Sequence, residues 1–282
     1  MAGGGLGGRS GTSVFRSRGR HAACRVARCA CLLGRTRYLL FMLNSYSSPL
    51  HAVILGGGGG LGAAFVDCLQ TALPDARLSV LARRPEAQQI ACDITDETSL
   101  AAAAEKLAAH PPIDVLVNAT GLLHDSEAEI APEKSLRQIE AAIMAQVLAV
   151  NAIGPALVLR HFLPLMRKDG KAVMAHLSAR VGSISDNRLG GWYSYRAAKA
   201  AQNMIVKNAA IEVGRRHRDL LIVGLHPGTV DTKLSAPFQG NVAAGKLFSP
   251  AQSAGYLLHV LDGLSREDSG HVFDWQGQQI PA

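Results

Sequence analysis

The sequence predicts a single α/β domain built on a doubly wound, seven-stranded parallel sheet. Short apolar runs alternate with stretches of helical spacing along most of the 282 residues. The runs are continuous and rich in Val, Ile and Leu, which indicates strands that are buried on both faces. Strands separated by helices form βαβ units, whose right-handed crossovers place helices on both faces of a parallel sheet.

Seven segments have the length and composition of buried strands. They are residues 51–57, 78–82, 88–93, 112–118, 171–178, 220–226 and 270–275. Helical spacing is found between them, over residues 61–73, 100–110, 132–150, 153–167, 195–215 and 250–261. Residues 233–248 show neither pattern, so we expect an irregular segment there.

The positive charge of the chain is concentrated in its first 41 residues, which contain eight Arg and no Lys, Asp or Glu. Removing these eight charges from the net +7 leaves −1, so the remaining body is nearly neutral. A neutral body lacks the basic surface by which proteins bind nucleic acid. No apolar run reaches the roughly 18–20 residues required to span a bilayer. We therefore expect neither a nucleic-acid partner nor a membrane.

The tail at residues 1–41 is open to two interpretations. It resembles an organellar transit peptide, since such peptides are rich in Arg and poor in acidic residues. Alternatively, it is translated upstream sequence, and the protein begins at Met42. We therefore divide the chain into a tail over residues 1–41 and one domain over 42–282. We expect a cytoplasmic domain, or one in a mitochondrion or other organelle if the tail is a transit peptide.

Cysteine and histidine give no sign of a disulfide framework or a metal site. Three of the five Cys lie in the tail and no CxxC pair occurs, which favours a reducing compartment. His124, His161, His176 and His226 lack the spacing of metal ligands. We expect no bound metal.

A glycine-rich turn follows the first predicted strand and precedes a helix. It contains Gly56, Gly60 and Gly62, and every position from 56 to 60 is Gly. Such a turn lets the backbone approach a pyrophosphate, whose oxygens then bind the free N–H groups of the following helix. The order of strand, turn and helix indicates a dinucleotide site, although the spacing is looser than GxGxxG.

Two arginines, Arg83 and Arg84, follow the second predicted strand. In a doubly wound fold this position faces the adenosine ribose, where an acidic residue would bind the 2′-hydroxyl of NAD. Arg83 occupies the position instead, and a guanidinium pairs well with a 2′-phosphate. The sequence therefore predicts NADP(H) as the cofactor, with Arg83 or Arg84 as its phosphate ligand.

Tyr195 and Lys199 lie four residues apart in a predicted helix, so their side chains share one face. A nearby ammonium and a positively charged nicotinamide would lower the pKa of the phenol. The phenol could then give a proton to a carbonyl oxygen as hydride arrives, or take one from an alcohol. This pair is the candidate catalytic core, and Lys199 could also bond the nicotinamide ribose.

These motifs resemble those of the classical short-chain dehydrogenases/reductases over about residues 51–275. The matching elements are Gly56 to Gly62, Asp93, Asn118-Ala-Thr-Gly121, Asn151, the Ser178 segment, Tyr195 to Lys199, and Pro227 to Thr232. Residues 177–192 resemble the C-factor-like branch, which includes carbonyl reductases of the sniffer type. The resemblance implies a Rossmann fold and an NADP(H)-dependent oxidoreductase that interconverts a carbonyl and an alcohol.

The resemblance also implies roles for individual residues. Asp93 would cap the adenine edge, Asn118 would brace the sheet, and Asn151 would hold a water in a proton relay to Lys199. The implied cofactor-binding residues are Gly56, Gly60, Leu61, Gly62, Arg83, Asp93, Ile94, Asn118, Tyr195, Lys199, Pro227, Gly228, Val230 and Thr232. The implied catalytic residues are Tyr195, Lys199, Asn151 and Ser178. Residues 233–248 follow the turn from Pro227 to Thr232, which would contact the cofactor. We therefore expect this irregular segment to form a lid over the substrate.

Two departures from the family pattern stand out. The usual NNAG appears as Asn118-Ala119-Thr120-Gly121, which loses one Asn. The catalytic Ser is expected three residues before Gly182, where this chain has Ala179. Because successive strand residues face opposite sides, Ser178 need not point toward the substrate. Ser178 and Ser183 are therefore both candidates for the missing hydroxyl.

These departures keep a second function open. A cofactor-binding signalling or regulatory protein with little or no catalysis would tolerate Ala179 and would fit the resemblance to the C-factor-like branch. For either function the resemblance implies a homodimer or homotetramer, formed through the helices near 151–167 and 195–214. The enzymatic interpretation also requires a small carbonyl or alcohol substrate, which the sequence does not identify.

Overall fold

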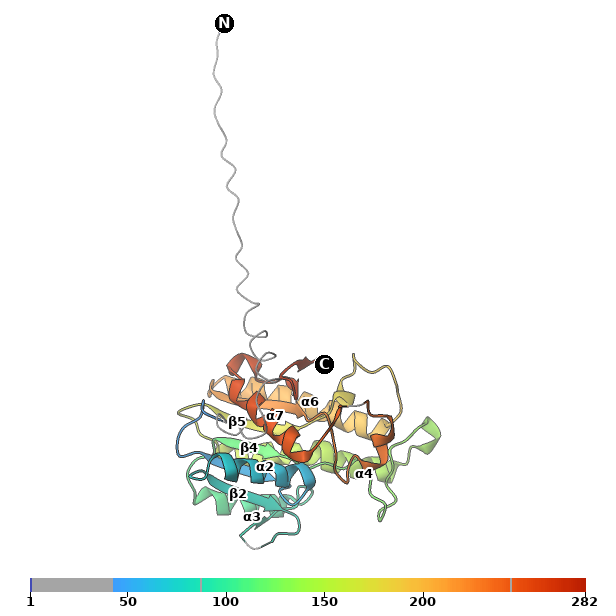
Figure 1. Cartoon of the computed structure of the whole chain (residues 1–282), viewed down its shortest axis with the longest axis horizontal. Coiled ribbons are helices and arrows are strands. Elements are labelled where there is room, and N and C mark those ends of the chain that lie inside the picture. The colour runs from blue at the N-terminus through green and yellow to red at the C-terminus, as the bar shows by residue number, and fades with distance from the viewer. Residues whose placement is uncertain (2–42, 87, 244) are drawn as a thin grey trace. The chain divides into compact units, whose positions relative to one another are not determined.

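The computed structural model describes residue 1 and residues 43–86, 88–243 and 245–282. From Leu43 onward these residues belong to one compact unit, whose elements are labelled in Figure 1. Apart from residue 1, the predicted tail lies outside the described residues, and so do both interpretations of it.

The central sheet has eight strands in the order β10-β9-β6-β5-β4-β1-β2-β3. They are β1 (His51–Leu55), β2 (Arg77–Ala82), β3 (Ile90–Ala91), β4 (Val115–Asn118), β5 (Ala172–Leu177), β6 (Leu220–His226), β9 (Val272–Asp274) and β10 (Gln279–Ile280). Seven strands are parallel, which confirms the predicted seven-stranded sheet. The eighth strand, β10, pairs antiparallel with β9, and its two residues are too few to give a sequence pattern.

Helices cover both faces of this sheet (Figure 1). On one face lie α2 (Gly60–Ala72) and α7 (Pro250–Gly263), and on the other lie α3 (Glu97–Ala108), α5 (Gly154–Phe162) and α6 (Tyr193–Gly214). Successive residues of β1 alternate between the two cores: Ile54 packs under α2 and α7, and Leu55 packs on the opposite side. Strand order reverses between β1 and β4, and ligands of doubly wound folds bind beside such a reversal.

The helix α4 (Ala141–Leu148) runs into α5 through a π-helical turn at Ala149–Ile153. The sequence predicted two helices here, whereas the structure has one helical run over Ala141–Leu165. By length and composition this run could cross a membrane, a test that core helices of globular proteins also pass. Gln146 and Asn151 interrupt the apolar run but carry no charge, so the helix still passes this test, and the expectation of no membrane partner stays a prediction.

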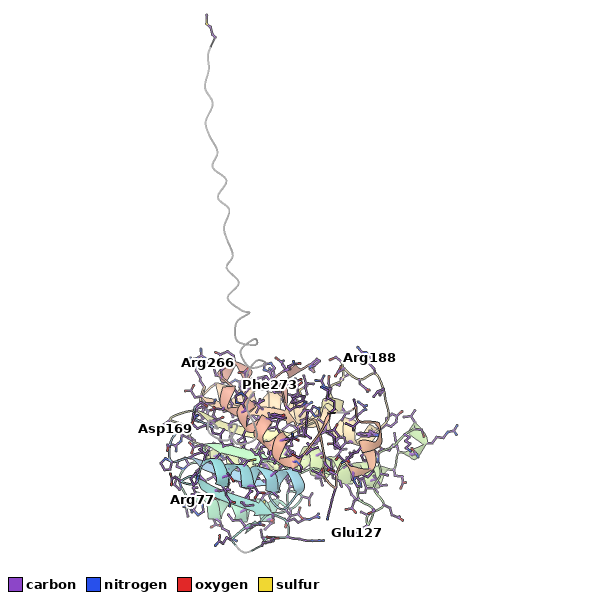
Figure 2. All side chains as sticks on the ribbon, in the orientation of Figure 1. Arg77, Glu127, Asp169, Arg188, Arg266 and Phe273 are labelled. Carbon is purple, nitrogen blue, oxygen red and sulfur yellow. The ribbon has the colours of Figure 1, made fainter. Side chains whose placement is uncertain are left out.

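The segment before β1 is part of the core, which the sequence did not predict. Leu43, Tyr46 and Leu50 are buried in the same apolar cluster as α7. The Tyr46 hydroxyl donates to the carbonyl of Leu261 near the end of α7, at 2.9 Å. Charged side chains such as Arg77, Asp169 and Arg266 are instead exposed around the domain, as Figure 2 shows.

Candidate active site

The glycine turn between β1 and α2 leaves no room for side chains. Gly56 has φ +79°, which favours glycine, and a Cβ at Gly62 would lie 2.1 Å from the Gly56 carbonyl oxygen. A Cβ at Gly57 would lie 2.3 Å from Val80. Helix α2 has no side-chain cap, so its first N–H groups remain available to an anion. The turn thus has the bare backbone and the free N–H groups that a pyrophosphate would need, and its role as a dinucleotide site stays a prediction.

The turn after β6 lies against this glycine turn. A Cβ at Gly60 would meet the side chain of Thr232 at 2.9 Å, so two predicted cofactor-binding residues that are distant in sequence are brought together. Gly228 has φ +75°, and a Cβ there would lie 2.7 Å from the ring of Phe248. Thr229–Val230 form strand β7, which pairs with β8 (Leu247–Phe248) and ties together the two ends of the irregular segment.

The predicted adenosine end of the site is formed by the loops after β2 and β3. Arg83 and Arg84 are exposed directly after β2. Burial acts to raise the pKa of Asp93, but bonds from the backbone and side chain of Thr95, together with the charge of Arg83, lower it overall. Asp93 therefore lies near Arg83 as a carboxylate. Ile94 is buried and packs its side chain against Gly154, so only its backbone could bind a cofactor.

Tyr195 and Lys199 lie one turn apart on α6, and both are buried. The Lys199 ammonium is 5.7 Å from the centre of the Tyr195 ring. It donates to the carbonyl of Leu177 at 2.7 Å and to the side chain of Gln202 at 2.8 Å. Because Leu177 ends β5, the bond from Lys199 to its carbonyl holds α6 against the carboxyl edge of the sheet. Within the described residues the Tyr195 hydroxyl has no hydrogen-bond partner.

Burial dominates the electrostatics of this pair. It raises the pKa of the Tyr195 phenol above its ordinary value of 10.0 and lowers the pKa of Lys199 to about 7. The sequence analysis expected the ammonium to lower the phenol pKa. Desolvation outweighs that attraction here, because neither side chain contacts water freely. The neutral phenol is the form that donates a proton, which suits reduction of a carbonyl.

Asn118 and Asn151 both fix the loop after β4. Asn118 accepts bonds from the N–H and hydroxyl of Thr120, and its amide lies 3.3 Å from His176 Nδ1. Asn151 sits in the π-helical turn, accepts from the N–H of Leu122 and donates to the Leu122 carbonyl. A third bond, to the carbonyl of Val147, occupies its remaining amide hydrogen. The side chain of Asn151 is thus used within the protein, and its relay role stays a prediction.

The Ser178 hydroxyl is bonded to the helix that carries Tyr195. It donates to the side chain of Asn203 at 2.6 Å, one turn beyond Lys199 on α6. Ser183 is turned elsewhere, because its hydroxyl contacts the backbone of Ala282 and Asp186. Ala179 is the residue that packs in the cluster of Tyr195. The catalytic role of Ser178 therefore stays a prediction, and the methyl group of Ala179 stands where the family pattern has the hydroxyl.

Two buried polar residues missed by the sequence analysis support α6. Glu133 accepts bonds from the N–H and hydroxyl of Ser194, and its backbone carbonyl accepts the N–H of Trp192 at 2.5 Å. No local pattern could reveal a contact between residues 61 positions apart. Gln202, by contrast, stands three residues after Lys199, and that spacing places both on one helix face.

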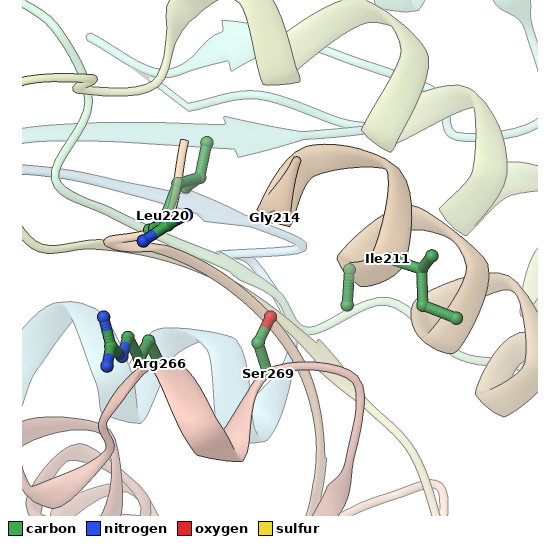
Figure 3. A pocket seen from close by; sticks show the side chains of 7 residues that line it. Ile211, Gly214, Leu220, Arg266 and Ser269 are labelled. Carbon is green, nitrogen blue, oxygen red and sulfur yellow. The ribbon is translucent and has the colours of Figure 1, made fainter. Parts of the chain in front are cut away.

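Two hollows of the described surface lie away from this site. One, of about 350 Å³, lies between the end of α6 and the start of β6, where Gly214, Leu220, Arg266 and Ser269 line it (Figure 3). A neighbouring hollow of about 740 Å³ lies between the ends of α5 and α6. Both are at the amino edge of the sheet, opposite to the glycine turn. Among the described residues no His, Cys, Asp and Glu cluster could hold a metal.

Comparison with known proteins assigns the family. Residues 60–257 match the family model described as enoyl-(acyl carrier protein) reductase, which represents short-chain dehydrogenases/reductases. The chain belongs to the short-chain dehydrogenase/reductase family, and it is an oxidoreductase of that family.

Particular relatives agree with this assignment. The chain is 36% identical over 170 residues to the C-signal protein of Myxococcus xanthus, covering 60% of this chain and 93% of that protein. It is similar to the NADPH-bound carbonyl reductase from chicken fatty liver, with TM-score 0.71 and 26% identity over 82% of this chain and 98% of that one. The carbonyl reductase Sniffer of D. melanogaster shares the fold, with TM-score 0.70, 20% identity and coverage of 83% and 99%.

Burial of Lys199 predicts a pH dependence of stability. Below about pH 7 the folded and unfolded chains both protonate Lys199, whereas between about pH 7 and its ordinary 10.5 only the unfolded chain does. Raising the pH through this range therefore stabilises the folded chain. Urea denaturation of the cofactor-free proteins measures the free energy of unfolding of the natural chain and of the Lys199→Met variant. We expect the difference between them, natural chain minus variant, to increase from about pH 7 to about pH 9. Parallel profiles for the two proteins would contradict a buried ammonium.

Proposed function

We propose that this protein is an NADP(H)-dependent oxidoreductase that interconverts a carbonyl and an alcohol, with Tyr195 as general acid and base. The observation that carries the proposal is the Tyr195–Lys199 pair at the end of β5. Strand β5 neighbours β4, and β4 neighbours β1, whose glycine turn fits a dinucleotide. The pair and the turn thus share the carboxyl edge of the sheet, where doubly wound folds bind ligands.

Different residues of the chain would have different roles in such a reaction. NADPH bound at the glycine turn supplies the hydride. The Tyr195 hydroxyl, free of protein partners within the described residues, donates its proton to the carbonyl oxygen of the substrate. Lys199 sits close enough to stabilise the phenolate that remains, and its ammonium can also bond ribose hydroxyls. In the oxidative direction the same phenolate accepts the alcohol proton.

Arg83 and Arg84 support NADP(H) over NAD(H). Both guanidinium groups are exposed after β2, the strand that borders the adenosine ribose in doubly wound folds. The structurally similar chicken carbonyl reductase is described as NADPH-bound. A guanidinium–phosphate pair provides the charge that distinguishes the two nucleotides.

A regulatory function with little catalysis is the second candidate. The methyl group of Ala179 beside Tyr195 removes one donor to the developing oxyanion, and such a donor contributes strongly to catalysis. The similarity to the C-signal protein also favours this candidate. A panel of carbonyl compounds with NADPH separates the two, since a regulator would bind NADPH without turnover.

The first prediction from this proposal concerns the general acid. Tyr195→Phe removes the proton donor but keeps the ring, so we expect kcat to fall by about 100-fold or more while the Kd of NADPH changes little. Carbonyl-dependent oxidation of NADPH measures kcat, and nucleotide fluorescence measures Kd. Full activity in this variant would refute the role of Tyr195.

The second prediction concerns cofactor choice. Arg83→Ala and Arg84→Ala, made singly, test which guanidinium binds the 2′-phosphate. We expect one of them to raise the Kd of NADPH by about 10- to 100-fold, the loss expected for a charge-assisted bond, and to leave the Kd of NADH unchanged. Equal effects on both nucleotides would indicate that neither side chain reads the phosphate.

The third prediction concerns assembly. We infer a homodimer or homotetramer through α5 and α6, because Ile153 beside α5 is 56% exposed and Met204 on α6 is 61% exposed. Met204→Asp should shift the protein toward the monomer in light scattering, because a charge would be buried at the interface. Ile184→Asp, at an exposed residue outside both helices, serves as the control and should not. A monomeric natural protein at micromolar concentration would overturn the inference.

A further inference from the structure

Apolar side chains from several elements of the chain form one cluster with Tyr195. Leu122 comes from the loop after β4, Val147 from α4, Ala179 from the end of β5, Trp192 from the start of α6, and Leu234 and Phe238 from the irregular segment. All of them belong to one cluster that includes the Tyr195 ring. The proposed proton donor thus belongs to a largely hydrocarbon cluster, whereas the opposite edge of the domain is rich in charge.

Two aromatic rings dominate this cluster. The Trp192 and Phe238 rings are 4.9 Å apart between centroids and meet edge to face, at 60°. The Trp192 ring is in turn 6.4 Å from the Tyr195 ring, at 73°. Edge-to-face geometry is the arrangement by which aromatic groups bind one another. Phe238 lies in the predicted lid and is half-buried, so movement of that segment would open a place beside Trp192 for another ring.

The polar and charged groups beside this cluster bond other parts of the chain. The Lys199 ammonium bonds Leu177 and Gln202, and the His124 ring, 5.7 Å from the Phe238 ring, bonds the carbonyl of Lys233 through Nε2. The carboxylate of Glu133 accepts both bonds from Ser194. The guanidinium of Arg196 donates to the backbone carbonyls of Gly191 and Val181. Ala179 supplies a methyl group where a hydroxyl was expected. Apart from Lys199, which the cofactor ribose would use, none of these groups offers an unpaired charge to an ionised substrate.

We infer that the substrate is an uncharged carbonyl compound with an aromatic or similarly flat apolar group, and that Trp192 and Phe238 bind this group. The inference rests on the proposed function and names its substrate class. An apolar ring buried between these side chains gains their contact area without losing hydration of its own. A carboxylate would lose its hydration with no partner to replace it, and a sugar-like polyol would lose several hydrogen bonds.

Matched pairs of ligands test this. Benzaldehyde, 4-formylbenzoate and glyceraldehyde offer an aldehyde with, respectively, a bare ring, a ring with a carboxylate and a polyol chain. With the full chain and NADPH, we expect kcat/KM for benzaldehyde to exceed that for either of the others by about 100-fold. Comparable or better use of 4-formylbenzoate or glyceraldehyde would overturn the inference.

Substitutions at Phe238 assign the effect to the cluster. Phe238 is half-buried, so its replacement should leave the fold intact. Phe238→Ala should lower kcat/KM for benzaldehyde by about 10-fold with the Kd of NADPH unchanged, and Phe238→Leu should restore most of the loss by refilling apolar volume. Phe238→Arg should improve the use of 4-formylbenzoate relative to benzaldehyde, because it places a cation beside the ring site. If none of the three changes the preference, the cluster does not bind the substrate.

A binding measurement separates this inference from the proposed function. Benzyl alcohol and 4-(hydroxymethyl)benzoate are titrated by calorimetry into the protein saturated with NADP⁺. If no aldehyde is turned over but benzyl alcohol binds at least about 10-fold tighter than 4-(hydroxymethyl)benzoate, the proposed ligand class stands and the catalytic proposal fails. Equal affinities, or no binding of benzyl alcohol, overturn the ligand class itself.

Discussion

The buried ammonium of Lys199 is the interaction on which the arrangement of this site depends. A cation taken out of water needs hydrogen-bond acceptors, because its lost hydration is otherwise uncompensated. The acceptors here are the carbonyl of Leu177 and the amide of Gln202, so the bond joins the last residue of β5 to α6. Since Tyr195 is one turn away on the same helix, the direction of its ring follows from that junction. The geometry of the Tyr195–Lys199 pair is thus held by the same contact that seats the helix on the sheet.

The sequence predicted the features that depend on neighbouring residues. The glycine turn was found because its steric requirement is local: Gly56 needs a positive φ, and Gly62 packs on its carbonyl. The Tyr195–Lys199 pair was found because four residues make about one helical turn. Seven strands were found because buried parallel strands are apolar throughout. Their ends differ from the predictions by a few residues, since apolar composition does not mark where pairing stops.

Features that depend on distant contacts were not predictable in this way. The support of Trp192 and Ser194 by Glu133 links residues about sixty positions apart. The π-helical turn holds Asn151, whose side chain bonds the backbone of Leu122 on another segment. Ser178 is a third case, because only the structure shows that its hydroxyl bonds Asn203 on α6. Each is a polar contact between segments, and apolar spacing carries no information about such pairs.

The packing of residues 43–50 under α7 sets a limit on how this domain can be cut. Tyr46 and Lys171 both bond the carbonyls that end α7, and Ser45 bonds Asp262 beside them. A cut at any point within these eight residues would remove a piece of the core together with everything before it. Recombinant trimming that keeps this packing intact therefore stops before Leu43.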